Sequence, residues 1–343
     1  MATPSKTASG GMYGGFPYDE VVFKYEFERI TDTWLDTLLT SGVMKADAQI
    51  ASIISKGSNK FSARYYKHLD ATKDMQIYNG EDNIEFDEVE GGEYFWAVYG
   101  RMKGWKARQF VDDFTGSDQM GYIVSQIAKY RSKQRQALLI KMLDGLFKIQ
   151  TPEGWKLHTT DISTTTGANE TNELGAGTIY EAITKACGDN ADGFKVVIMH
   201  SAVAAKLNVL KLLEFDKYTD NSGITTDLRT ATFNGMRVII NDNVPVEKGA
   251  SNKYTTYVLG EGAFGYASAP VSHPLEYDRD PVTNGGIDKI MFRMRECIVP
   301  YGFSWKGDVL TDVGIPDTEL VKASNYELFE DPKSIKLVKI VSN

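Results

Sequence analysis

Apolar and polar residues follow a helical period over one long stretch, residues 117–148. Apolar side chains recur there at steps of three and four positions: Met120, Ile123, Ile127, Tyr130, Leu138, Met142 and Leu146. Steps of that size place side chains on one face of an α-helix. Ser117 or Asp118 is suited to cap the first amides. We therefore predict one amphipathic helix, roughly 45–50 Å long at 1.5 Å per residue. Such a strut is more typical of a building block than of a ligand pocket.

A second pattern, with a period of two, predicts a long hairpin over residues 60–102. In its first half, apolar residues alternate with polar neighbours at Phe61, Ala63 and Tyr65. In its second half, residues 93–102 (EYFWAVYGRM) are rich in aromatic residues that favour strands. Asn79-Gly80 lies between the halves and is a tight-turn signal, but the wide spacing favours a loose, extended loop.

Charge divides this hairpin into an acidic far half and basic flanks. The flanking basic residues are Lys60, Arg64, Lys67 and Lys73 before the loop, and Arg101, Lys103, Lys106 and Arg108 after it. Nine residues are candidate contacts with a neighbouring subunit, since complementary charge can fix the register of an interface. They are Lys60, Arg64, Lys67, Glu81, Asp82, Glu85, Asp87, Glu88 and Glu90. The alternative is a solvated loop, which is the commoner meaning of a charge run and which the sequence alone favours.

After a polar linker at 159–178, the pattern changes to a mixed block of helices and strands. Helices are predicted at 179–186 and 201–215, and strands at 194–200, 236–244, 254–260 and 286–305. In the last strand, Ile290, Phe292, Met294 and Ile298 share one face, and Arg293 and Arg295 lie on the other. The predicted fold class is α+β, and 343 residues favour about two domains.

Composition narrows the possible partners. The formal net charge of −8 argues against broad binding of a phosphate backbone, which needs clustered Lys and Arg. Cys187 and Cys297 are the only cysteines, too few for a disulfide framework or a zinc site, and fit a reduced compartment. No apolar run approaches the ~20 residues that span a bilayer, so we expect no membrane partner.

Candidate chemistry is sparse, and we predict neither enzyme activity nor a cofactor nor a metal. Gly260–Gly265 formally matches a dinucleotide motif, but Pro270 and Pro274 oppose the helix that such a site requires. His200, Ser201 and Asp242 could serve a hydrolase, yet no nucleophile-elbow motif surrounds the serine, which is placed as a helix cap. The acidic loop lacks the ligand spacing of a calcium-binding EF-hand.

Three stretches are informative as an ordered set: residues 102–147 (MKGWKARQFVDDFTGSDQMGYIVSQIAKYRSKQRQALLIKMLDGLF), 196–207 (VVIMHSAVAAKL) and 233–246 (FNGMRVIINDNVPV), the last followed by 254–267 (YTTYVLGEGAFGYA). In this order and spacing they resemble the major capsid proteins of tailed bacteriophages, which have the Hong Kong 97-type fold. The resemblance covers roughly residues 57–305, and its specificity comes from the ordered set.

The resemblance implies a division of the chain into five segments. They are an N-terminal arm (1–56), an extended E-loop (57–116), a peripheral (P) domain with the spine helix (117–175), an axial (A) domain (176–285), and a P-domain return strand with the C-terminal segment (286–343). It implies that the E-loop overlaps a neighbouring subunit.

The implied function is that of a virion protein. Copies of the chain would assemble as pentamers and hexamers into an icosahedral head around double-stranded DNA, in the cytoplasm of a bacterial host. We expect a portal and, because only about 56 residues precede the E-loop, a separate scaffolding protein as partners. An encapsulin-type nanocompartment with the same fold is the nearest alternative, and an α/β hydrolase is a more distant one.

Overall fold

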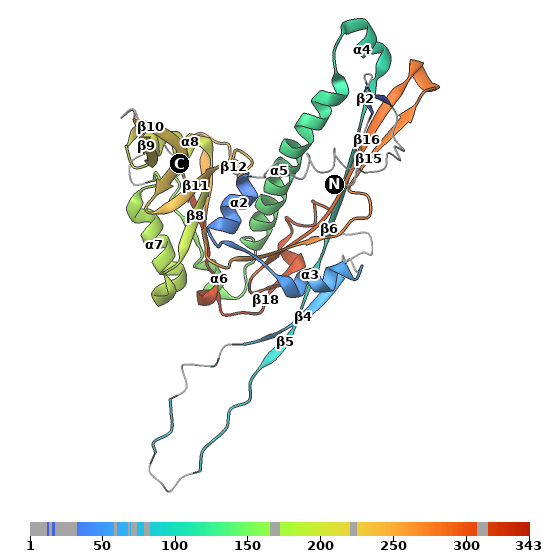
Figure 1. Ribbon diagram of the computed structural model, residues 1–343. Coiled ribbons are helices and arrows are strands. Elements are labelled where there is room, and N and C mark those ends of the chain that lie inside the picture. The colour runs from blue at the N-terminus through green and yellow to red at the C-terminus, as the bar shows by residue number, and fades with distance from the viewer. Residues whose placement is uncertain are drawn as a thin grey trace.

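The long predicted helix is the central element of the computed structural model, which describes residues 12–13, 16–17, 33–57, 60–67, 69, 74–78, 83–164, 172–219, 225–306 and 315–343. This helix, α5 (Gln119–Leu146), begins two residues inside the predicted range. Asp118 caps it, because its Oδ1 accepts from the Gly121 amide at 2.8 Å. In Figure 1 it runs beside the long strands toward the short helix α4 (Gln109–Thr115).

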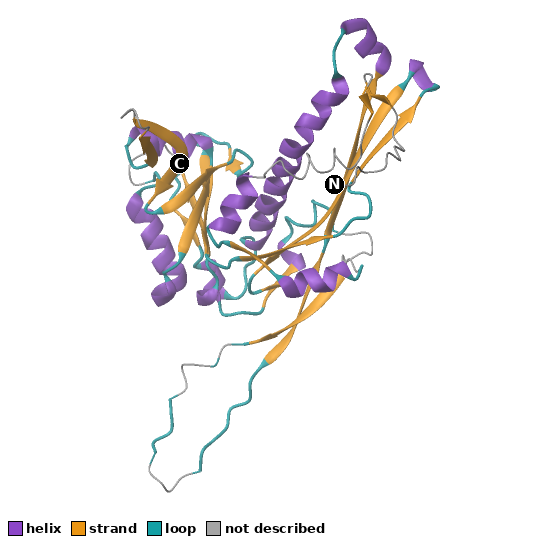
Figure 2. Cartoon of the chain, viewed as in Figure 1, coloured by secondary structure: helices purple, strands orange, loops and turns teal. Residues whose placement is uncertain are grey.

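A five-stranded sheet supports α5 along one face. Strand β16 (Ile287–Pro300) pairs antiparallel with β6 (Tyr99–Arg108) on one side, and with β14 (Phe264–Ala269) and β15 (Leu275–Asp280) on the other. Strand β3 (Met44–Ala46) adds parallel to β14. Ile290 and Phe292 of β16 pack in one buried cluster with Met120 and Ile127 of α5. The predicted apolar face of this strand is therefore confirmed at Ile290 and Phe292. Figure 2 shows α5 lying beside the long strands.

The largest of the described sheets has eight strands. Its order is β7 (Thr159–Asp161), β19 (Leu337–Ser342), β13 (Lys253–Gly260), β8 (Phe194–Met199), β11 (Met236–Ile240), β10 (Thr225–Phe233) and β9 (Glu214–Thr219), with β12 (Val246–Glu247) paired to β13. Helices α7 (Ala176–Cys187) and α8 (Ser201–Val209) contribute to the buried cluster on this sheet. The strands predicted at 194–200 and 254–260 are confirmed as β8 and β13.

Three predicted elements are shorter than the pattern indicated, and one of them, the strand predicted at 236–244, ends at Ile240 as β11. The helix predicted at 201–215 ends at Val209, because Lys211 adopts a left-handed conformation (φ 55°) and the chain re-enters a sheet at Glu214. The strand predicted at 286–305 is interrupted after Pro300, where Gly302 has φ 82°. The remainder, β17 (Phe303–Trp305), leaves the five-stranded sheet and pairs with β18 (Tyr326–Leu328).

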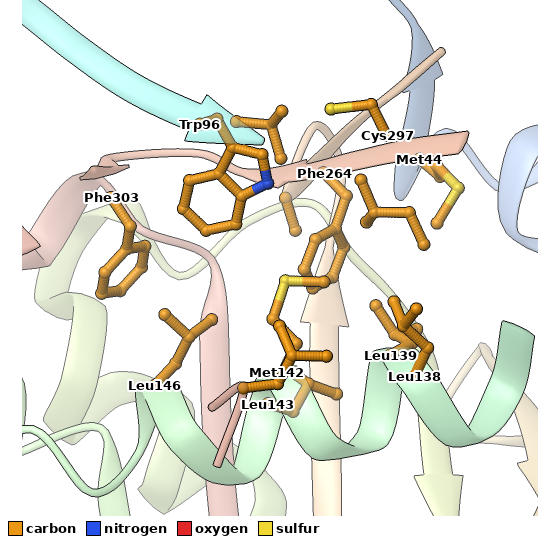
Figure 3. Close-up of a cluster of buried hydrophobic side chains, with 14 of the residues drawn as sticks. Met44, Trp96, Leu138, Leu139, Met142, Leu143, Leu146, Phe264, Cys297 and Phe303 are labelled. Atoms are coloured by element: carbon orange, nitrogen blue, oxygen red, sulfur yellow. The ribbon is translucent and has the colours of Figure 1, made fainter. Parts of the chain in front are cut away.

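The last turns of α5 form the centre of the largest hydrophobic core. Leu138, Leu139, Met142, Leu143 and Leu146 point toward Met44, Trp96, Phe264 and Phe303 in Figure 3. This core joins the N-terminal elements α2 (Thr33–Thr40), β3 and α3 (Ala48–Ser55) to the helix and to the C-terminal end of β16. The short helix α6 (Glu153–Lys156) adds the buried Trp155.

Strand pairing crosses the predicted segment boundaries. Strands β14 and β15, within the segment 176–285, pair with β16 of the five-stranded sheet. Strand β19, near the C-terminus, lies between β13 and β7 of the eight-stranded sheet. The five-segment division stays a prediction, and the two sheets are the units described below. A short pair, β1 (Met12–Tyr13) and β2 (Phe16–Pro17), completes the described strands.

Candidate subunit-contact site on the projecting hairpin

The predicted hairpin is present, and its two paired strands, called its root below, are fixed to the body of the protein. Strands β4 (Lys60–Tyr66) and β5 (Gly91–Ala97) pair antiparallel, from Lys60 opposite Ala97 to Tyr66 opposite Gly91. The Tyr65 ring lies 4.0 Å from that of Phe329, and the Phe95 amide donates to Ser304 Oγ at 3.0 Å. Trp96 is fully buried against Trp305. The root is therefore as well anchored as a core strand.

Beyond the root, the described residues 67, 69, 74–78 and 83–90 lie on a projecting loop that extends away from the body (Figure 1). Its described residues 74–78 and 83–90 belong to no helix or strand. The Glu85 amide donates to Gln76 Oε1 at 3.0 Å across the loop, but no strand ladder joins the described residues beyond Lys67 and Glu90. Since even a two-stranded hairpin is marginally stable in water, the root is the main support of this loop within a single chain.

The projecting loop exposes large apolar side chains. Met75, Ile77, Tyr78, Ile84, Phe86 and Val89 are each more than 60% exposed, and Phe86 reaches 89%. Large apolar side chains exposed close together in the sequence of a soluble protein are typical of an interaction site. The hydrophobic effect thus favours a partner surface that covers the loop.

Two of the basic residues predicted as contacts, Lys67 and Arg64, form ion pairs within the chain. Lys67 Nζ lies 2.8 Å from Glu90 Oε2, and Arg64 Nε lies 3.8 Å from Glu93 Oε1. The Glu90 carboxylate raises the pKa of Lys67 by hydrogen bonding and by charge. These pairs join the two strands of the hairpin where the loop begins, and as exposed, solvent-screened pairs they contribute little to stability.

The remaining predicted contacts lie further out or outside the described residues. Glu85, Asp87 and Glu88 are exposed on the returning limb. Lys60 begins β4 at the root, away from these three. Glu81 and Asp82 lie outside the described residues. The contact role of all nine residues stays a prediction.

A buried ionic cluster, which the sequence analysis missed, fixes α5 to the sheet. Arg135 Nε donates to Glu296 Oε2 at 2.7 Å, and Arg131 Nη2 donates to Glu296 Oε1 at 3.0 Å. Burial raises the pKa of Glu296, but the two guanidinium groups outweigh it and hold the pKa below its usual value. The sequence carried one signal for this cluster. Glu296 lies at an inward position of the alternating apolar face of β16, where an acidic side chain needs a cationic partner.

A second ionic cluster attaches the segment after residue 314 to the same two elements. Arg101 of β6 donates to the Ile315 carbonyl at 2.9 Å and pairs with Asp317. Lys141 of α5 donates to Asp317 Oδ2 at 2.9 Å. The two cations outweigh the effect of burial and lower the pKa of Asp317. The Asp317 carboxylate thus joins α5 and β6 to the C-terminal segment.

The residues considered for hydrolysis are adjacent but not arranged as a triad. Asp242 Oδ1 accepts from the Ser201 amide at 3.2 Å and lies 3.7 Å from His200 Nε2. His200 Nδ1 accepts from the Ala202 amide at 3.1 Å. A catalytic histidine must face the serine hydroxyl to take its proton, whereas this ring caps a helix. Hydrogen bonds from Ser201 lower the pKa of Asp242, consistent with its role as a cap.

The remaining candidate motifs are structural. Gly260 ends β13, Gly262 takes φ 73°, and β14 follows at Phe264, so the glycine motif is a strand-to-strand turn. Within the described ranges, no group of three or more His, Cys, Asp or Glu side chains is placed to hold a metal ion. Among the helices that the structure describes, none has both the length and the apolar character required to cross a membrane.

Comparison with known proteins identifies the fold. No protein-family model matches the chain. Over 313 residues the chain is 28% identical to the major capsid protein of Bacillus phage SPP1, covering 90% of this chain and 91% of that protein. The capsid of Ralstonia phage GP4 matches with a TM-score of 0.56 at 11% identity, covering 89% of this chain and 88% of that one. The mature capsid of bacteriophage PhiM1 gives a TM-score of 0.50 at 12% identity, covering 87% and 85%. The chain has the Hong Kong 97-type fold of phage capsids.

Proposed function

We propose that this chain is a major capsid protein, whose copies self-assemble as pentamers and hexamers into an icosahedral phage head. The observation that carries the proposal is the projecting loop, because its apolar side chains are exposed in one chain and have a use only in an assembly. Similarity to the SPP1 major capsid protein over 90% of the chain supports it. The buried ionic clusters and the strut fit a role in bearing load between neighbours rather than in catalysis.

The architecture suits a subunit that must occupy both pentamers and hexamers. A rigid body carries each loop at a fixed root, while the loop itself can change angle where no ladder restrains it. A head-to-tail contact between different surfaces of the same chain generates rings, and small changes of angle alter the number of subunits. Each contact can be modest, because a closed shell multiplies the contacts that each subunit must break to leave.

The partners and location follow from this role. The shell would enclose double-stranded DNA without sequence-specific binding, and the net charge of −8 is consistent with limited adhesion to phosphate. A separate scaffolding protein and a portal are the expected assembly partners. The protein would be a component of the virion, assembled in the bacterial cytoplasm, and we assign it no catalytic step and no cofactor.

Electron microscopy and analytical ultracentrifugation of the purified chain test the proposal. We expect closed shells or capsomer-sized rings, from the chain alone or with its scaffolding protein. A matched variant, in which Asn-Gly replaces residues 69–88, should keep its circular dichroism spectrum and form neither. A chain that stays monomeric at high concentration with scaffolding protein present would contradict the proposal. Shells that enclose a cargo enzyme and no DNA in cells would instead support a nanocompartment.

A further inference from the structure

A cavity of about 560 Å³ lies beside the hairpin root. Its lining comes from β3 and the first turn of α3, from the two strands of the root, from the turn after Pro300 and from the segment that follows β18. In Figure 1, α3, β4 and β5 lie together where the projecting loop leaves the body. Small-molecule sites typically enclose roughly 300–1,000 Å³, so this cavity is large enough to hold a ligand.

Aromatic rings form much of the cavity wall. The ring of Phe329 lies 4.0 Å from that of Tyr65 and 5.7 Å from that of Tyr94, centre to centre. Tyr301, on the turn after β16, lines the same cavity and is 44% exposed. The face of an aromatic ring carries partial negative charge and attracts a cation that lies over it. The wall therefore favours a ligand that combines apolar groups with a positive charge.

The charged residues of the cavity have the same preference. Asp47 and Glu330 line it together with one basic residue, Lys45. The Lys45 ammonium lies 3.1 Å from Glu261 Oε1, so its charge is compensated by a residue outside the lining. Backbone amides donate to the Asp47 and Glu330 carboxylates, which positions these charges without neutralising them. Glu330 is only 7% exposed, and a buried carboxylate attracts a cation more strongly than one in water.

The negative charge also reaches the tyrosines of the wall. Burial raises the pKa of Tyr94, and the Asp47 carboxylate raises it further. Burial and the Glu330 carboxylate likewise raise the pKa of Tyr301. Lys67, which also feels the Glu330 charge, lies 2.8 Å from Glu90 Oε2. An anionic ligand would be repelled here, whereas a cation would be attracted by the carboxylates and by the rings alike.

We propose that this cavity binds a small alkylammonium ion, with its apolar groups against Tyr65, Tyr301 and Phe329 and its charge toward Asp47 and Glu330. Aromatic cages recognise alkylated ammonium groups in this way, because such a cation is easily desolvated and attracted by ring faces. A bound ion would join α3, the hairpin root and the segment after β18, and so stabilise the subunit by mass action. The whole lining belongs to one chain, so binding does not depend on assembly.

Choline and its neutral isostere test the proposal on the full chain, kept dilute and unassembled. The isostere is a dimethylbutanol that carries a tert-butyl group in place of the trimethylammonium group. Ligand-observed saturation-transfer NMR measures both dissociation constants, with sodium chloride keeping the ionic strength equal. Choline should bind about 10-fold more tightly than the alcohol, because the two ligands share one shape and differ in charge.

Carboxamide substitutions identify the source of this preference. Asp47→Asn with Glu330→Gln removes both charges, and asparagine caps a helix about as well as aspartate. This double variant should bind choline about 10-fold more weakly and the alcohol as before. The matched control, Glu181→Gln with Asp189→Asn, removes the same charges from exposed positions at α7 and should bind choline like the unaltered chain.

The outcomes are separate from those that test the proposed function, because none of these measurements requires a shell. If choline shows no saturable binding, or binds no more tightly than the alcohol, the proposal is wrong. It is also wrong if the double carboxamide variant binds choline like the unaltered chain. Circular dichroism verifies folding. If the double variant misfolds, Tyr301→Leu replaces it, and this variant should bind choline about 5-fold more weakly with little change for the alcohol.

Discussion

Arg135 on the long helix α5 donates from Nε to the buried carboxylate of Glu296 on strand β16, at 2.7 Å. Their side chains are 2% and 6% exposed, and 161 residues separate them in the sequence. The Arg135 guanidinium also lies 6.0 Å from the centre of the Tyr266 ring on β14. This pair fixes the register of the strut on its sheet, because displacing either group would leave a buried charge without its most buried partner.

Removal of Arg135 should destabilise the subunit strongly. The substitution Arg135→Ala leaves the Glu296 carboxylate buried with only Arg131 beside it, and breaking a buried pair costs about 3–5 kcal/mol. Urea unfolding of the dilute, unassembled subunit, followed by tryptophan fluorescence, measures the loss. Arg131→Ala is the matched control, and it should cost less because Arg131 is 32% exposed. Equal losses in the two variants would show that Arg135 has no special role.

The same carboxylate should make stability depend on pH in the acid range. The pKa of Glu296 is lower in the folded protein than the ordinary value of 4.5. The pair therefore contributes fully above about pH 4.5, and its contribution is lost as the pH falls through the depressed folded pKa. Unfolding free energies of the native chain and of Glu296→Gln, measured from pH 3 to 7, should converge at the acid end. A difference between them that stays constant with pH would refute this origin.

Gly145 should resist substitution although it lies in a helix. A Cβ at this position would meet the Leu320 carbonyl oxygen and lie 2.8 Å from Tyr326 Cε2. Gly145→Ala should therefore lower the unfolding free energy by about 1–3 kcal/mol through overpacking. Gly177→Ala in α7 is the matched control, because nothing lies within 4 Å of its added Cβ. Gly177→Ala should raise the unfolding free energy by about 0.5–1 kcal/mol. Thermal unfolding should therefore show a lower midpoint for Gly145→Ala and a higher one for Gly177→Ala than for the unaltered chain.

Apolar side chains on the projecting loop should affect assembly without affecting the fold. Ile84 and Phe86 are 74% and 89% exposed in the single chain. Ile84→Ser with Phe86→Ser should change subunit stability by no more than about 0.5 kcal/mol, as surface substitutions do. The concentration required for shell formation should rise, because less apolar area is buried on assembly. Light scattering during assembly, paired with urea unfolding of the subunit, measures both. Unchanged assembly would show that these two side chains are not part of the interface.

The two cysteines should be unreactive in the folded protein. Cys187 and Cys297 are buried, and burial raises the pKa of the Cys187 thiol to about 11 and that of Cys297 further. Since the thiolate is the reactive form, a thiol reagent at pH 8 should label neither residue until denaturant is added. Ser52→Cys, on the exposed face of α3, is the positive control. Rapid labelling of the native chain at either cysteine would contradict the described packing.

Local sequence patterns determined those elements of the fold that have one face toward the core and the other toward water. The three- and four-residue steps of 117–148 predicted α5, and the alternation around Phe61 and Ile290 predicted β4 and the faces of β16. The resemblance of three ordered stretches to phage major capsid proteins is confirmed by the match to the SPP1 protein. The exposure of Glu85, Asp87 and Glu88 was also implicit in their charge.

Relationships between distant elements were decided only by the tertiary structure. Nothing local to Arg135 identifies Glu296 as its partner, and nothing in residues 337–342 indicates that they pair with both β13 and β7. The break after Pro300 likewise depends on another strand, β18, which pairs with residues 303–305. A periodic pattern records which side of an element avoids water, but it does not record what lies on that side. That choice is made by the packing of the whole chain, where one carboxylate in an apolar face is tolerated only because two arginines reach it.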